Sequence, residues 1–255
     1  MGLSVNATWL IAFLLAFVRA GAWMIAMPAF SDIKVIPPIA VACSAAGLAI
    51  LAAPTIPASA LPVDTPGLIG AILLQALTGA AMGFVVNLIL QAFTAAGSVL
   101  DLAGGLNLPG AVDPLSTNQT PMVGQFYQQV ALLLLFGTGG YLEIVAGFLH
   151  SFKLQSFDLG SLHLLAVVLT ADLATLWTSA LEMAGPVLLV LFTTQVALAL
   201  LSRAAPQLNV WQLGMPLQIF LTLSLVAVAI TVFPAYLTGA VSHAVNDVGA
   251  LFGAH

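Results

Sequence analysis

Long apolar blocks with few charges dominate this sequence, and they restrict the chain to a membrane fold. Six blocks reach or exceed the roughly 17 to 25 residues of a membrane-spanning helix: residues 7–28, 36–54, 68–100, 122–149, 162–202 and 217–239. Only 5% of the residues are charged and the mean hydropathy is +1.13, too few charges to cover a water-soluble globule. Because hydrocarbon tolerates only helices or closed barrels and no block alternates with period two, we expect an all-α integral membrane protein of about six helices.

Two of these blocks are too long for a single perpendicular span. Residues 162–202 would extend roughly 60 Å as one helix and residues 68–100 about 50 Å, against a hydrocarbon core of about 30 Å. The only helix-breaking residues inside the longer block lie in the segment 182–186 (Glu-Met-Ala-Gly-Pro). They can kink or break a helix. These helices are expected either to bend within protein or to continue beyond the bilayer.

Charge and motif content exclude several classes of function. The net charge is −5 and the four basic residues are far apart, whereas nucleic-acid binding needs clustered Lys and Arg. The single Cys43 allows no internal disulfide. The sequence contains no HExxH, GxSxG, Walker or GxGxxG motif. We therefore expect no enzymatic activity, no metal or other cofactor, and no nucleic-acid partner.

A row of small and amide residues runs along the block 68–100. Its members are four residues apart: Gly79, Gly83, Asn87 and Gln91. Small residues at this spacing let two helix backbones approach closely where lipid supplies no hydrophobic drive. The partner helix is either in the same chain or in a different subunit, and the amides could hydrogen-bond across either interface.

A second polar row lies on one side of the block 162–202. It consists of Asp172, Thr175, Ser179 and Glu182, which fall within about 80° of arc on a helix. Carboxylates at membrane depth are costly unless they face protein, water or a cation. Three interpretations remain open: a buried hydrogen-bond network or helix end at the membrane interface, an aqueous or ion-coupling pathway, or docking to a basic partner segment.

The connection 101–121 is unusually long and mixed in composition. It contains three glycines and three prolines among Leu and Val residues, and it lacks a basic residue. Loops of this length are usually functional or disordered, and the apolar side chains argue against a freely solvated linker. We expect an ordered loop covered by protein that occludes a cavity; a simple surface excursion is the alternative.

The segment 203–216 carries the most specific pattern. It reads Arg-Ala-Ala-Pro-Gln-Leu-Asn-Val-Trp-Gln-Leu-Gly-Met-Pro between two apolar runs, and its key members are Arg203, Pro206, Gln207, Asn209, Gly214 and Pro216. Together with Asp113-Pro114, Gln119, Pro121 and Gln125-Phe126, it resembles the signature of the FliR/SctT family of type III secretion export-apparatus proteins. The resemblance covers essentially the whole chain and is closer to the flagellar branch than to the injectisome branch.

The resemblance implies a core subunit of a flagellar protein export gate. Family members assemble with FliP and FliQ copies into a right-handed, cone-like complex that associates with FlhB and FlhA. This hetero-oligomer lies in the bacterial inner membrane at the flagellar basal body, surrounded by lipid and projecting to the periplasmic side. Unfolded flagellar proteins are exported through it. Residues 1–185 then correspond to a FliP-like part, and residues 186–255 to a FliQ-like helical hairpin with its turn at 203–216.

In the same family the central loop plugs the closed pore, and it is moved aside during export by energy from other subunits. The corresponding plug residues here are Gly104, Gly105, Leu106, Asn107, Leu108, Pro109, Gly110, Val112, Asp113 and Pro114. The chain departs from the family pattern at Asn107, Leu108 and Val112. The alternative function is a self-contained, ion-coupled small-solute transporter that uses Asp172 and Glu182.

Overall fold

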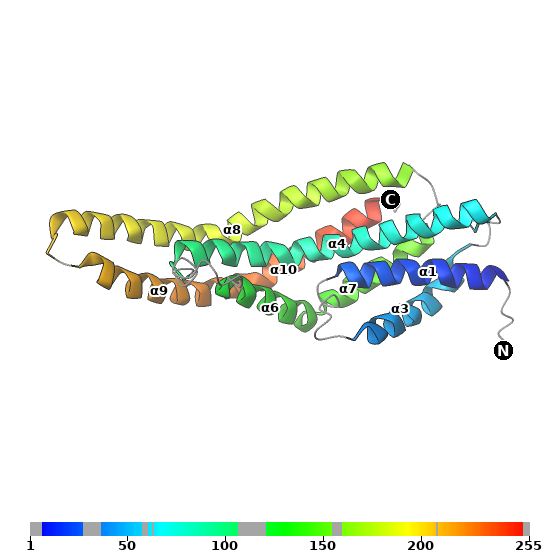
Figure 1. The fold of residues 1–255 in the computed structure, drawn as a ribbon, viewed down its shortest axis with the longest axis horizontal. Helices are drawn as coiled ribbons and strands as arrows, with labels where there is room; N and C mark the ends of the chain where they lie inside the picture. Colours follow the sequence, from blue (N-terminus) through cyan, green and yellow to red (C-terminus); the bar gives the residue numbers. More distant parts are fainter. Residues whose placement is uncertain are drawn as a thin grey trace, which may run out of the picture. The chain divides into compact units, whose positions relative to one another are not determined.

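The computed structural model is all-α over the residues that it describes, which confirms the predicted fold class. These residues are 7–27, 37–57, 61–62, 64–106, 121–154, 160–207 and 209–251. In chain order the elements are α1 (Ala7–Ala26), α3 (Pro38–Ala52), the 3₁₀ turn η1 (Ala53–Thr55), α4 (Thr65–Ala103), α6 (Met122–Gly137), α7 (Gly140–Leu154), α8 (Gly160–Ala204), α9 (Val210–Ala229), the 3₁₀ turn η3 (Ile230–Val232) and α10 (Phe233–Leu251) (Figure 1).

Length and hydropathy mark most of these helices as membrane-spanning. Within the described residues, five helices or helix pairs are long and apolar enough to cross a bilayer, and six if α6 and α7 together form one span. Many large apolar side chains are exposed on them, including Leu73, Phe192 and Phe220. Exposure of such a large apolar surface to water would be unfavourable, whereas lipid or neighbouring subunits can cover it. The chain is therefore an integral membrane protein.

Local sequence explains where two of the helices begin. Pro38 is the first residue of α3, a position at which the missing proline N–H costs no helical hydrogen bond. Asp64 precedes α4, and its carboxylate accepts a hydrogen bond from the Gly67 N–H at 3.3 Å. This contact satisfies one of the four free N–H groups at a helix start.

The two overlong blocks are single helices. α4 has 39 residues and α8 has 45. α8 continues through Pro186, although proline removes one intrahelical hydrogen bond. The segment 182–186 is thus not a break between two helices.

The apolar block 122–149 is broken, in contrast to the single block expected from the sequence. α6 ends at Gly137, and α7 begins at Gly140. Gly139 has a φ of +77°, a left-handed conformation that glycine adopts readily and other residues avoid. The break therefore sits where a run of glycines allows the chain to leave the helical conformation.

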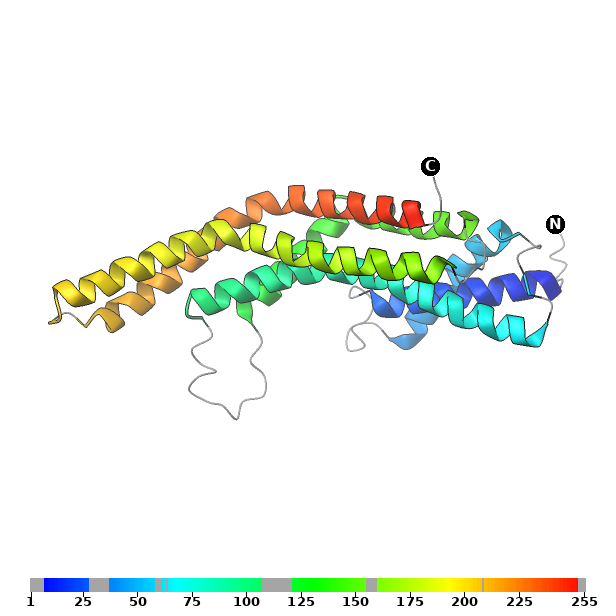
Figure 2. The same ribbon diagram turned by 90° about the horizontal axis from the view of Figure 1, so that it is seen from above.

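The chain divides into two compact units. The first contains Met1–Leu88, Gly139–Leu173 and Gly239–His255, and the second contains Ile89–Thr138 and Ala174–Thr238. The predicted division between residues 185 and 186 falls inside α8 and stays a prediction. In the second unit, the C-terminal part of α8 and α9 run side by side as a helical hairpin (Figure 2).

An aromatic cluster forms part of the core of the first unit. Trp23 of α1 stacks on Phe148 of α7 with ring centroids 4.5 Å apart, and Phe148 meets Phe152 edge-on at 5.2 Å. All three side chains are buried. Such aromatic pairs add about 0.5–1.5 kcal/mol to the burial of their surfaces, so they hold α1 against α7.

Candidate functional site

The base of the central loop in the second unit is held by several hydrogen bonds and close backbone contacts. Its first part is the end of α4, which closes in a Schellman motif. Gly105 adopts a φ of +71°, the Leu106 N–H donates to the Asp101 carbonyl at 3.0 Å, and the Gly105 N–H donates to the Leu102 carbonyl at 3.4 Å. These bonds satisfy carbonyls that a helix end would otherwise leave free. α4 therefore ends at a fixed point directly before the loop.

Three of the predicted plug residues belong to this cap. Gly104, Gly105 and Leu106 form its turn. The remaining predicted plug residues lie outside the described residues: Asn107, Leu108, Pro109, Gly110, Val112, Asp113 and Pro114. Residues 101–103, which the sequence assigned to the loop, are the last residues of α4.

The side chain of Asp101 joins the end of α4 to the start of α6. Its Oδ2 accepts hydrogen bonds from the Val123 N–H at 3.0 Å and from the Gly124 N–H at 3.1 Å, and its Oδ1 lies 3.1 Å from the Val123 nitrogen. These are the second and third residues of α6, whose N-cap residue is Pro121 and provides no side-chain acceptor. Asp101 is fully buried. The carboxylate thus performs the capping role from another helix, in the favourable field of the helix N-terminus.

Glycine allows the backbones of α4 and α6 to touch beside this cap. A Cβ placed on Gly97 would lie 2.6 Å from the Gly124 Cα, and a Cβ placed on Gly124 would lie 2.8 Å from the Ser98 Oγ. Real Cβ atoms do not approach other atoms this closely. Position 97 therefore requires glycine for the two helices to lie at their observed spacing, whereas the atom nearest to position 124 is a side-chain oxygen that can rotate.

Two contacts from the α8–α9 hairpin hold the end of α4 from the other side. The Gln195 side-chain amide donates to the Ala103 carbonyl at 2.9 Å. A Cβ on Gly104 would lie 2.4 Å from the Thr222 Oγ1, and Thr222 is fully buried. The end of α4 is consequently fixed by α8 and α9, and the start of α6 is fixed by α4.

Tyr127 lies one turn after Val123 on α6 and is fully buried. Its ring meets Phe233 edge-on with centroids 4.6 Å apart, and Phe93 meets Phe233 in the same manner at 5.1 Å. The Tyr127 hydroxyl is buried and has no hydrogen-bond partner among the described residues. A buried hydroxyl without a hydrogen-bond partner costs stability, so this hydroxyl does not stabilise the packing next to the loop base.

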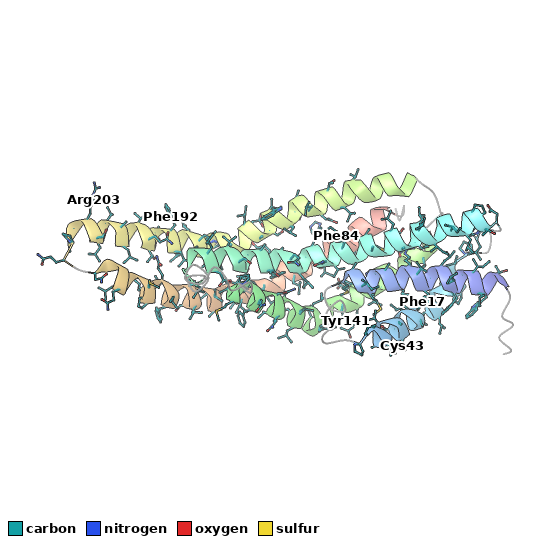
Figure 3. The ribbon with its side chains drawn as sticks, viewed as in Figure 1. Phe17, Cys43, Phe84, Tyr141, Phe192 and Arg203 are labelled. Carbon is teal, nitrogen blue, oxygen red and sulfur yellow. The ribbon has the colours of Figure 1, made fainter. Side chains whose placement is uncertain are left out.

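The segment 203–216, which carries the sequence pattern of the export-apparatus family, occupies the end of the α8–α9 hairpin. Arg203 lies in the last turn of α8 and is exposed; Figure 3 shows its side chain directed away from α9. Pro206 and Gln207 lie in the turn. Asn209 caps α9, because its Oδ1 accepts from the Gln212 N–H at 3.3 Å.

The predicted turn 203–216 is longer than the observed one. α8 ends at Ala204 and α9 begins at Val210, so Gly214 and Pro216 lie inside α9. Gly214 is buried and a Cβ there would lie 3.2 Å from a methyl group of Leu198. The glycine permits close packing of the two helices and does not end one of them.

The Gly79 and Gly83 row packs against a helix of the same chain. A Cβ on Gly79 would lie 2.2 Å from the Arg19 carbonyl oxygen, and one on Gly83 would lie 2.4 Å from the Trp23 carbonyl oxygen. α4 and α1 therefore touch backbone to backbone in the first unit. Further along the row Asn87 is half-buried and Gln91 is exposed.

The polar row on α8 does not form a cluster of ligating groups. Asp172 and Ser179 are half-buried, whereas Thr175 and Glu182 are exposed. Among the described residues, no group of three or more His, Cys, Asp or Glu side chains could hold a metal ion.

Arg19 is a fully buried cation in α1. Its guanidinium donates to the Ser151 Oγ at 2.8 Å, and its Cζ lies 4.5 Å from the centroid of the Phe152 ring. Hydrogen bonding and cation–π contact both favour a buried guanidinium.

Comparison with known proteins supplies the family. Residues 10–244 match the family described as "Bacterial export proteins, family 1". Flagellar biosynthetic protein FliR of Bacillus subtilis (strain 168) is 29% identical over 227 residues, which cover 87% of this chain and 86% of that protein. FliR of Escherichia coli (strain K12) is 31% identical over 178 residues, covering 69% and 67%. Yop proteins translocation protein T of Yersinia pestis is 26% identical over 147 residues, covering 56% of each chain.

Proposed function

The chain belongs to family 1 of the bacterial export proteins, and we propose that it is a core subunit of the flagellar type III protein export gate in the inner membrane. The similarity to flagellar FliR proteins over most of both chains supports the flagellar assignment. The apolar helices support a place in the membrane. The subunit would be required for assembly of the flagellum.

The proposed partners are FliP-like and FliQ-like subunits, together with FlhB and FlhA. Apolar side chains exposed on α8 and α9 support this proposal, since they include Leu189, Phe192 and Phe220. Neighbouring subunits of similar hydropathy can cover these helices as well as lipid can. Unfolded flagellar proteins are the proposed export substrates.

The proposed role of the central loop is to close the channel when no substrate is present. The observation that carries this proposal is the anchored loop base. The loop leaves α4 at a Schellman motif and rejoins the chain at α6, whose start is held by the buried Asp101 carboxylate. Fixed ends reduce the entropic cost of holding a loop of this length in one place. Gating would then be passive, with energy supplied by other subunits.

Replacement of residues 108–119 by a Gly/Ser linker of equal length tests the function of the loop. Gly104 to Leu106 and Pro121 stay unchanged, so that the contacts at the base are retained. In vesicles that contain the assembled complex, the replacement is expected to raise potassium efflux. The control is a Gly/Ser replacement, also without change of length, of the five residues 155–159, which join α7 to α8. Unchanged efflux after the loop replacement would contradict a plug at this position.

A second measurement separates the export gate from a self-contained transporter. The purified chain alone, in liposomes, is expected to accumulate no small solute in response to a proton or sodium gradient. Uptake that depends on both Asp172 and Glu182 would favour the transporter instead.

A further inference from the structure

We propose that Asp101 is a positioning residue of the central loop, which holds the start of α6 at the end of α4 and so fixes the two points between which the loop runs. This inference deepens the proposed function and rests on it. It assigns a role to a buried carboxylate that belongs to none of the predicted site residues. The role follows from three features: burial, the donors that the carboxylate meets, and the other contacts at the loop base.

Burial makes a carboxylate an expensive choice at this position. Asp101 has no exposed surface, and a charge removed from water is costly unless it is paired or hydrogen-bonded. Its compensation comes from the N–H groups of Val123 and Gly124, at the positive end of the α6 dipole. If α6 moved away, the carboxylate would lose both of these donors. The interaction therefore resists separation of the two helices.

The start of α6 depends on this contact more than the end of α4 does. The end of α4 has its own Schellman motif, the hydrogen bond from Gln195 and the packing of Gly104 on Thr222. α6 has no side-chain cap of its own, because Pro121 occupies its N-cap position. Removal of the carboxylate should thus release the start of α6 and leave the end of α4 in place. The two ends of the loop would then no longer keep a fixed separation.

The test combines loss of the carboxylate with an engineered link between the same two helices. The variants are Asp101→Ala and Asp101→Asn, each made in a Cys43→Ser background. Asparagine can place its one oxygen where Oδ2 accepts from both N–H groups, but it loses the charge and puts an amide nitrogen near the Val123 N–H in place of Oδ1. Its effect should therefore fall between those of aspartate and alanine. In vesicles with the assembled complex, we expect a severalfold rise in potassium efflux for Asp101→Ala and a smaller rise for Asp101→Asn.

The engineered link is a disulfide between Ser98→Cys and Gly124→Cys. The Cβ of residue 124 would lie 2.8 Å from the Ser98 Oγ, close to the about 3 Å between one Cβ and the opposite sulfur that follows from an S–S bond of about 2.05 Å. When this pair is oxidised in the Asp101→Ala protein, efflux should return to the level of the same pair with Asp101 intact. Reduction of the same sample should restore the leak, so each preparation is its own control.

Two outcomes would overturn the proposal. One is an Asp101→Ala complex that leaks no more than the complex with Asp101 intact, although replacement of the loop does cause a leak. The other is a leak that persists after the disulfide has formed, which would mean that the carboxylate acts on the pore by its charge and not by holding α6. The rate of disulfide formation gives a readout independent of the pore: it should fall in Asp101→Ala relative to the Asp101 protein. If loop replacement causes no leak but this rate still falls, the plug proposal fails while the positioning role of Asp101 stands.

Discussion

Replacement of Gly79 by alanine should force α4 away from α1. The added Cβ would lie 2.2 Å from the Arg19 carbonyl oxygen, which belongs to the backbone of α1. A backbone atom cannot rotate away as a side chain can. To restore an ordinary contact distance, the two helices would have to separate locally by about 1 Å, and such a gap already forfeits a large part of the dispersion energy along the seam.

The expected cost can be isolated by a control on the same helix. Gly70 also lies in α4, but a Cβ there meets no atom within 4 Å. Both substitutions gain the same helix propensity, about 0.8–1.0 kcal/mol for alanine over glycine. Gly79→Ala in addition causes overpacking, which typically costs about 1–3 kcal/mol. The difference between the two variants should therefore be about 1–3 kcal/mol, with Gly70→Ala the more stable.

Unfolding of the purified complex by titration with sodium dodecyl sulfate would measure this difference. Loss of α1–α4 packing can be followed by the fluorescence of the protein, since Trp23 lies buried in α1. Gly83→Ala should behave like Gly79→Ala, because its Cβ would lie 2.4 Å from the Trp23 carbonyl oxygen. The double variant should cost less than the sum of the two single changes, since one separation of the helices relieves both clashes. Equal stability of the Gly79→Ala and Gly70→Ala proteins would refute the backbone contact.

Two further substitutions test buried polar groups by the same titration. Tyr127→Phe removes a hydroxyl that has no partner among the described residues and keeps the ring, so stability should be unchanged or rise by about 1–3 kcal/mol; a clear loss would indicate that a bound water satisfies the hydroxyl. Arg19→Lys keeps the charge but loses the planar guanidinium that bonds Ser151 and lies over Phe152. This variant should be destabilised by about 1–3 kcal/mol, and a wild-type midpoint would contradict the role assigned to these contacts.

The helices themselves could be predicted from hydropathy, because a polar backbone in hydrocarbon has few alternatives. Hydropathy does not reveal the break in block 122–149. An apolar run conceals a break when the residues at the break are small and uncharged, as at Thr138 and Gly139. The sequence did contain the signal, a cluster of glycines from Gly137 to Gly140, which is a common mark of a helix end.

The hairpin turn is shorter than the sequence predicts, because a glycine and a proline that suggest a turn lie within a helix. Gly214 and Pro216 are helix breakers by propensity, yet both lie inside α9. Gly214 is needed where Leu198 packs against the helix, so tertiary packing decides its place. Helix propensity therefore predicts the ends of a helix poorly at positions where two helices pack so closely that only glycine fits.

The ends of the two helices that flank the loop could be predicted to within a few residues, but the residue that joins them could not. Rules for helix caps look for Ser, Thr, Asp or Asn directly before the helix. Here Pro121 stands in that position, and the capping carboxylate comes from Asp101 on another helix. A contact between residues this far apart in the chain leaves no local pattern. The only trace in the sequence is an acidic residue at the end of a long apolar block.

The choice of a charged residue for this task has a physical rationale. If Asp101 served stability alone, a well-packed apolar side chain could serve as well, since replacement of buried charges by apolar residues is often neutral or stabilising. An apolar contact tolerates sliding between helices, because it depends on area and not on direction. A carboxylate that accepts from the N–H groups of Val123 and Gly124 loses its compensation when α6 moves along or away from α4. The directional bond therefore fixes the register of the two helices, which is the property that a loop with a defined closed position requires at its base.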